Sequence, residues 1–141
     1  QIRSKDVGFV FQSFHLLPRL SALDNVMMPL EILGAKDAKE RALKALDEVG
    51  LSKRTGHVPH QLSGGEKQRV AIARAMVKAP SILFADEPTG NLDQSSTDNI
   101  LELLLGINKQ TKTTLVVVTH DQQLASRSDM VFELQEGKLK C

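Results

Sequence analysis

Two short apolar segments, each followed at once by charged or polar side chains, constrain the fold of this chain most. Residues 82–85 are followed by Asp86 and Glu87, and residues 115–118 are followed by Thr119 and His120. The chain between them carries apolar residues at the 3.6-residue spacing of a helix that packs on a sheet. Continuous apolar strands on both sides of such a helix are typical of a parallel sheet buried on both faces. The sequence therefore predicts a β-α-β unit and an α/β fold.

The first third of the chain predicts one more strand and the start of a helical region. Residues 7–11 are β-branched and aromatic, which predicts a strand that ends at Gln12. A helical pattern begins at Ser21, where Asp24 supplies the second member of a capping pair. We expect Pro29 to break or bend this helix, because proline removes an N–H from the helical ladder.

Three further elements follow from local patterns. An apolar stripe over residues 42–49 predicts a helix, and Gly50 stands where a left-handed C-terminal cap is expected. Ser63 opens the next helix, and Glu66 three residues later completes a capping box. Residues 131–139 predict a small hairpin.

The three predicted strands place polar residues at their carboxyl ends, namely Gln12, then Asp86 and Glu87, then His120. Ligands bind at this edge of an open parallel sheet. Asp86 suits a Mg2+ ion through its hard oxygens, and Glu87 suits a general base. Each residue also has a simpler interpretation, as a solvated loop amide, a helix cap or a surface histidine.

The segment Ser63-Gly64-Gly65 places two glycines at a helix N-terminus. The exposed N–H groups and the helix dipole attract an anion there, and the absent side chains let a phosphate approach closely. A plain helix cap explains Ser63 and Glu66 equally well, but it does not require the two glycines.

Charge and composition exclude several classes of protein. Eighteen basic and seventeen acidic residues leave a net charge of +1, so we expect no nucleic-acid partner. No apolar run reaches the length of a membrane span. The single cysteine, Cys141, excludes an internal disulfide and favours a reducing compartment. The chain starts at Gln1 without a Met, which we interpret as a start within a domain.

Taken together, these elements resemble the nucleotide-binding subunit of ATP-binding cassette (ABC) transporters. The resemblance extends over nearly the whole chain, and within the family it is to the branch of the lipoprotein-release, macrolide-export, cell-division and YbbA-like ATPases. It rests on Gln12, Leu-Ser-Gly-Gly-Glu-Lys-Gln-Arg at 62–69, Ile-Leu-Phe-Ala-Asp-Glu-Pro at 82–88, Asn-Leu-Asp at 91–93, and His120-Asp121.

The resemblance implies an α/β fold, the C-terminal part of a P-loop NTPase-like ABC ATPase domain over residues 1–141. Residues from about 20 to 76 would form a helical signature subdomain that meets transmembrane permease subunits. Residues 1–19 and 77–141 would be parts of the parallel-sheet core.

The resemblance also implies roles at an ATP site with Mg2+. Gln12 would contact the metal and the attacking water, Asp86 would hold the metal, Glu87 would be the catalytic glutamate, and His120 would contact the γ-phosphate. A second ABC ATPase subunit would complete an ATP-sandwich dimer. In that dimer Ser63, Gly64 and Gly65 would bind the γ-phosphate of the opposite subunit's ATP, and Asp93 would lie at the interface.

The family's phosphate-binding loop, G-x-x-x-x-G-K-[ST], does not occur in these 141 residues. The only Gly-Lys pair is Gly137-Lys138, with Phe132 at the position of the required first glycine. We therefore expect the chain to lack the N-terminal part of the domain. By itself it would hydrolyse little ATP and would self-associate through exposed sheet edges and faces.

The leading hypothesis is thus an ATP-binding and hydrolysing subunit that powers a membrane transporter, located in the cytoplasm and peripheral on the inner face of the plasma membrane. One alternative is a non-transport ABC-type ATPase of repair or translation, although no extended heptads separate Gln12 from Ser63. Another is a non-catalytic module that contributes only its signature segment.

Overall fold

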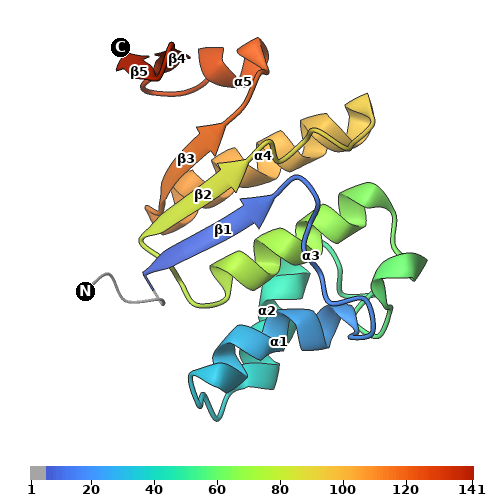
Figure 1. Ribbon diagram of the computed structural model, residues 1–141. Helices are drawn as coiled ribbons and strands as arrows, with labels where there is room; N and C mark the ends of the chain where they lie inside the picture. Colours follow the sequence, from blue (N-terminus) through green and yellow to red (C-terminus); the bar gives the residue numbers. More distant parts are fainter. Residues whose placement is uncertain (1–5) are drawn as a thin grey trace.

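The computed structural model describes residues 6–141, so Gln1 and the rest of residues 1–5 of the predicted core segment 1–19 lie outside the described residues. The described part contains a group of consecutive helices after β1, then strands and helices in turn, and a hairpin at the end (Figure 1). In chain order they are β1 (Val7–Phe11), α1 (Ala22–Ile32), α2 (Ala38–Glu48), a 3-10 turn (Pro59–Gln61), α3 (Gly64–Met76), β2 (Ile82–Asp86), α4 (Gln94–Thr111), β3 (Thr114–Val118), α5 (Gln122–Ser126), β4 (Glu133–Gln135) and β5 (Lys138–Lys140).

The first three strands form a parallel sheet in the order β1-β2-β3. Helix α4 connects β2 to β3, so the predicted β-α-β unit is confirmed, and the predicted strand at residues 7–11 is confirmed as β1. The register of the three strands also aligns their carboxyl ends. Phe11 pairs with Asp86, and Asp86 pairs with Val118. The residues that follow these three positions therefore leave the sheet at one edge.

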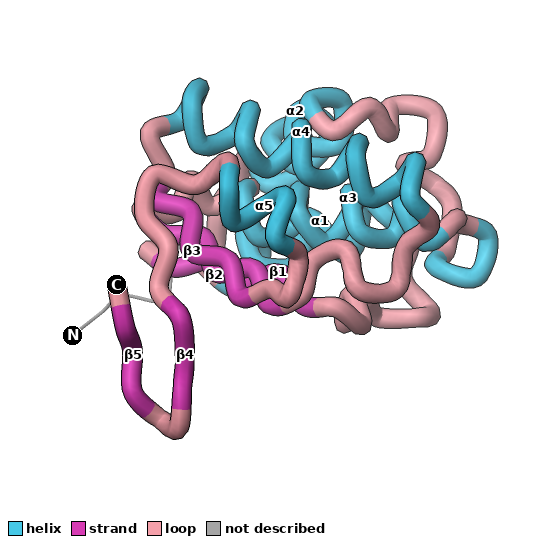
Figure 2. The backbone as a smooth tube through the Cα atoms, turned by 90° about the horizontal axis from the view of Figure 1, so that it is seen from above, coloured by secondary structure: helices cyan, strands magenta, loops and turns pink. Residues whose placement is uncertain are grey.

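The helices of the described part cover one face of this sheet. Helix α3 packs against β1 and α4 packs against β3, and Figure 2 shows the helices on one side of the three strands. Side chains along β1 and β2 alternate accordingly, with Val10 and Leu83 buried and Phe9 and Phe84 exposed. The prediction that the apolar strands are buried on both faces is therefore wrong for residues 6–141, because a continuous apolar sequence does not reveal how many layers cover it.

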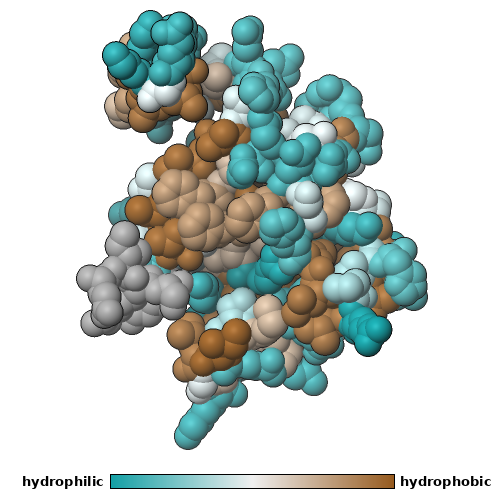
Figure 3. Space-filling view, in the orientation of Figure 1, coloured by the Kyte–Doolittle hydropathy of each residue, from teal (hydrophilic) through white to brown (hydrophobic). Residues whose placement is uncertain are grey.

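The opposite face of the sheet is apolar and exposed. It carries Phe9, Phe84, Val116 and Val118, which together we call the apolar sheet face. The rings of Phe9 and Phe84 stack with their centroids 5.4 Å apart. Figure 3 shows this area as a brown and tan patch over the strands.

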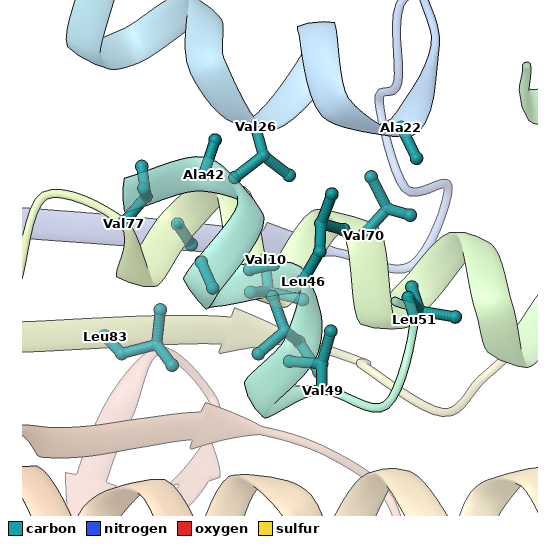
Figure 4. Close-up of a cluster of buried hydrophobic side chains, with 14 of the residues drawn as sticks. Val10, Ala22, Val26, Ala42, Leu46, Val49, Leu51, Val70, Val77 and Leu83 are labelled. Carbon is teal, nitrogen blue, oxygen red and sulfur yellow. The ribbon is translucent and has the colours of Figure 1, made fainter. Parts of the chain in front are cut away.

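The core lies between the sheet and the helices and continues into a bundle of α1, α2 and α3 (Figure 4). The stripe predicted over residues 42–49 is buried, with Leu46 and Ala42 fully enclosed. Helix α2 ends where predicted, since Gly50 follows it with φ of +77°. Burial of this stripe fixes α2 against α1 and α3, because apolar area leaves water only when the three helices pack together.

Helix α1 begins as predicted but does not stop at Pro29. The Ser21 side chain accepts a hydrogen bond from the Asp24 amide, so the capping pair is confirmed. The helix then continues through Pro29 to Ile32, so of the two expected outcomes, a break or a bend, the break is wrong. Val26 and Leu30 on either side of the proline are buried in the core, and this packing compensates for the single helical hydrogen bond that Pro29 cannot donate.

The predicted hairpin at the end of the chain is confirmed as β4 and β5, which pair antiparallel. Its turn is Glu136-Gly137, and both residues have positive φ values, +49° and +75°. Such values define the tight turn that matches the right-handed twist of a two-stranded hairpin.

Candidate functional site

The residues predicted to follow β2 and β3 meet at the carboxyl edge of the sheet. Glu87 Oε1 lies 3.3 Å from His120 Nε2. The Glu87 amide donates to the Val118 carbonyl at 2.8 Å, which joins the turn after β2 to the end of β3. The His120 side chain is fully exposed, whereas that of Glu87 is largely buried. This edge therefore presents a carboxylate held in place beside an imidazole that is open to solvent.

Glu87 has an unusual backbone conformation. Its φ of +45° lies in the left-handed region, which costs a residue with a side chain about 1–3 kcal/mol. Two hydrogen bonds hold it there, the one to Val118 and one from the Gly90 amide to the Glu87 carbonyl at 3.0 Å. Strained residues of this kind are concentrated at functional sites, because the surrounding structure must hold them in place.

Gln12 belongs to the same edge through the loop that follows Glu87. Gln12 Nε2 donates to Asn91 Oδ1 at 3.3 Å, and Asn91 Nδ2 donates to the Gln12 carbonyl at 3.1 Å. A Cβ atom on Gly90 would lie 2.5 Å from Gln12 Nε2, so only glycine leaves room for this side chain. Nothing in the sequence points to this role of Gly90 except its place between an acidic pair and the start of a helix.

Asp86 ends β2 with an exposed carboxylate beside this group. Asp86 and Gln12 offer oxygen atoms, the ligand type that Mg2+ prefers, so the donor chemistry fits this ion. Among residues 6–141, no group of three or more His, Cys, Asp or Glu side chains forms a complete metal site. A Mg2+ ion here would therefore take most of its ligands from water and phosphate, as is usual for nucleotide sites.

The predicted capping box at the start of α3 is confirmed. Ser63 Oγ accepts from the Glu66 amide at 3.2 Å, and Glu66 Oε2 accepts from the Ser63 amide at 2.9 Å. The hydrogen bond from Ser63, with help from the nearby Arg54 guanidinium, lowers the pKa of Glu66 below its ordinary value. Ser63 itself is exposed, so its side chain and the first turn of α3 face solvent.

The two glycines of α3 also have a packing role, which no local sequence pattern indicates. A Cβ on Gly64 would lie 3.2 Å from Leu92 Cδ2, and a Cβ on Gly65 would lie 3.1 Å from Ser96 Oγ. The start of α4 thus rests directly on the first turn of α3. Small residues are therefore required here for the close approach of two backbones. This reason adds to the one suggested by the sequence, which is access for an anion.

Asp93 caps α4 at this contact. Its Oδ1 accepts from the Ser96 amide at 2.9 Å and its Oδ2 from Ser96 Oγ at 3.0 Å, and these bonds lower the pKa of Asp93. Ser96 is also the residue that faces Gly65. The Asp93 side chain therefore orders the α3–α4 contact within one chain.

Two polar residues of α3 reach the carboxyl edge of the sheet and the loop after β1, although no local sequence pattern points to either. Gln68 is fully buried and reaches the ends of β1 and β2. Arg74 donates to the carbonyls of His15 at 2.7 Å and Phe14 at 3.0 Å, and burial lowers its pKa. The Arg74 side chain thus turns toward the loop after β1, because α3 lies across this strand.

A family comparison agrees with this arrangement. Residues 1–90 match the family model described as ABC transporter.

The chain belongs to the ABC transporter family.

Its similarity to individual ABC proteins extends over nearly its whole length. It is 54% identical to the lipoprotein-releasing system ATP-binding protein LolD of Legionella pneumophila (strain Paris) and 52% identical to the uncharacterized ABC transporter ATP-binding protein YbbA of Escherichia coli (strain K12). Each alignment covers 99% of this chain and 62% of the relative. The chain thus spans less than two thirds of the length of these ABC relatives.

Solved structures of ABC cassettes show the same fold. A dimeric post-hydrolysis state of the cassette MJ0796 bound to ADP and Pi superposes with a TM-score of 0.82 at 40% identity. A dimeric structure of MJ0796, described as a bacterial ABC transporter cassette, gives 0.83 at 41%. Each match covers 97% of this chain and 62% of the cassette, so the α/β fold is that of part of an ABC ATPase domain.

Proposed function

We propose that this chain is part of an ATP-binding and hydrolysing subunit that powers an ABC membrane transporter. The observation that carries the proposal is the contact of 3.3 Å between Glu87 and His120. It lies at the sheet edge where Asp86 ends β2 and Gln12 follows β1. Both named relatives are ATP-binding proteins of transport systems, which favours transport over a repair or translation ATPase.

Each residue of this edge has a task in the proposed hydrolysis. Glu87 accepts a proton from the attacking water, since its carboxylate is fixed by the turn that follows β2. His120, exposed beside it, contacts the γ-phosphate. Asp86 and Gln12 hold Mg2+, which when bound supplies positive charge that offsets the charge of the phosphates.

The start of α3 serves a second subunit in this proposal. Ser63 and Gly64 direct the N-terminal amides of α3 toward the γ-phosphate of ATP held by that subunit, and Gly65 lets α4 pack closely behind them. Asp93 would lie at the dimer interface. The dimeric cassettes among the similar structures support this assembly.

Residues from about 20 to 76 form, in this proposal, the subdomain that meets transmembrane permease subunits. Ile32 and Leu33 at the end of α1 are exposed apolar side chains, which suits a protein contact. Within residues 6–141 the longest helices are too short or too polar to cross a bilayer. We therefore propose a peripheral location on the cytoplasmic face of the inner membrane, reached through the permease.

The test is ATP turnover by the complete protein with and without Glu87→Gln. We expect the variant to lose at least about 100-fold in kcat while it still binds ATP, because the general base is lost and the phosphate contacts are not. Glu133→Gln, an exposed glutamate on β4 outside the proposed contacts, is the matched control and should leave kcat unchanged. Turnover that persists in Glu87→Gln would contradict the assigned role.

The 141-residue chain by itself should behave differently from the complete protein. Because its sequence contains no G-x-x-x-x-G-K-[ST] loop, we propose that it has weak nucleotide affinity and little ATPase activity. We also propose that it self-associates through the apolar sheet face. Sedimentation at micromolar concentrations tests this, and a monomer throughout would contradict it.

A further inference from the structure

Gln68, in the middle of α3, is one of three buried polar residues found among residues 6–141. The other two, Asn25 and Thr113, use their side chains in several hydrogen bonds to nearby loops. Gln68 Nε2 donates to the carbonyl of Pro88 at 2.5 Å and more weakly to that of Phe11 at 3.4 Å. Its Oε1 is buried and has no hydrogen-bond partner among the described residues.

The orientation of this amide is determined by its neighbours. Both nearby groups are carbonyl oxygens, which only accept hydrogen bonds, so the NH2 end of Gln68 must face them. A methionine would fill nearly the same volume and would leave no side-chain acceptor unpaired. The distinctive contribution of Gln68 is therefore its pair of donated hydrogen bonds.

Those bonds end directly beside two of the residues in the candidate site. Phe11 precedes Gln12, and Pro88 follows Glu87. They also connect the ends of β1 and β2 from the buried side, in addition to the strand pairing and the exposed hydrogen bonds between Gln12 and Asn91. A single side chain of α3 thus holds the backbone at the end of β1 and the backbone just after β2.

The turn after β2 requires such support, because Glu87 is held at a φ of +45°. Its amide donates to Val118, its carbonyl accepts from Gly90, and the next carbonyl, that of Pro88, accepts from Gln68. Without the last bond the Pro88–Thr89 peptide loses its anchor on α3, and we expect the turn that carries Glu87 to move relative to His120.

We propose that Gln68 is a positioning residue, which fixes Glu87 and, through Phe11, Gln12 in the geometry needed for hydrolysis. This inference rests on the function proposed above. Gln68 touches no reacting atom in this proposal; it acts through the backbone of the two neighbouring segments. The expected signature is a loss in kcat with little change in the KM for ATP, since the phosphate contacts lie elsewhere.

The experiment compares the complete wild-type protein with Gln68→Met in MgATP turnover and in hydrogen–deuterium exchange. We expect kcat to fall at least 10-fold and KM to stay within twofold. Exchange over residues 87–90 should accelerate at least 10-fold, while exchange over α2 should not change. Ile72→Val, at a fully buried apolar position of the same helix, is the matched control and should leave kcat within twofold.

Other results would overturn the proposal. A kcat for Gln68→Met within twofold of wild type would do so, as would faster exchange spread equally over α2 and α3, which would indicate a packing role only. If Gln68→Met does not fold, Gln68→Asn, which is one methylene too short to reach Pro88, is measured in the same way. A wild-type protein without turnover would refute the proposed function. In that case the positioning role is decided by the exchange measurement only, from the difference between wild type and Gln68→Met over residues 87–90.

Discussion

Gly90→Ala should damage the candidate site without damaging the fold. An alanine Cβ at this position would lie 2.5 Å from Gln12 Nε2 and 2.8 Å from its Cδ. Ordinary contacts between such atoms begin near ~3.5 Å, so the Gln12 amide must move by about 1 Å. Gln12 is a flexible side chain at the surface, and it can move where backbone could not. The displacement therefore falls on one side chain of the site.

The expected effects on stability and on turnover differ greatly. Displacement breaks the exposed hydrogen bond from Gln12 to Asn91, which is worth about 0.5–1.5 kcal/mol or less. A shift of about 1 Å in a group that orients the reacting atoms can cost ~100-fold in rate. We expect a small loss of unfolding free energy in urea and a loss of roughly 10- to 100-fold in kcat for ATP in the complete protein.

The double variant isolates the cause. In a Gln12→Ala background the clash is absent, so adding Gly90→Ala should change kcat by less than about twofold. Gly56→Ala, where a Cβ meets nothing within 4 Å, is the control for a glycine change as such. The reasoning is refuted if Gly90→Ala reduces kcat equally in the presence and in the absence of the Gln12 side chain.

Three further predictions concern stability. Leu46→Ala should lower the free energy of unfolding by about 2–5 kcal/mol in urea melts, because the side chain is fully buried, whereas the exposed Leu43→Ala on the same helix should cost far less. Ser63→Ala should cost about 0.5–2 kcal/mol, measured in the same way, because it removes the cap of α3; no loss would show that Glu66 alone suffices. Glu66 has a lowered pKa in the folded chain, so its stabilising contribution is present above the pKa of the unfolded state and is lost as pH falls through the folded value. Glu66→Gln should accordingly flatten the acid limb of the stability curve, and an unchanged limb would contradict this.

The elements of this fold were largely predictable because their signals are local. Ser21 and Ser63 cap helices with residues three positions away, and the turn at Gly137 lies within a few residues of both of its strands. The βαβ unit followed from chain-local apolar runs, and parallel pairing then placed Glu87 and His120 at one edge. Two predictions were wrong, the burial of the sheet on both faces and a break of the helix at Pro29. Each depends on which other elements pack nearby.

Sequence alone determined which residues end each strand and which start α3. Capping hydrogen bonds and apolar periodicity act between residues that are close together along the chain. Only the tertiary structure decided what α3 touches. Gly65 lies against Ser96, Gln68 against Pro88 and Arg74 against His15, contacts that span 20 to 60 residues. They depend on how one helix lies across the sheet, and that angle is set by the packing of the whole core rather than by any local pattern.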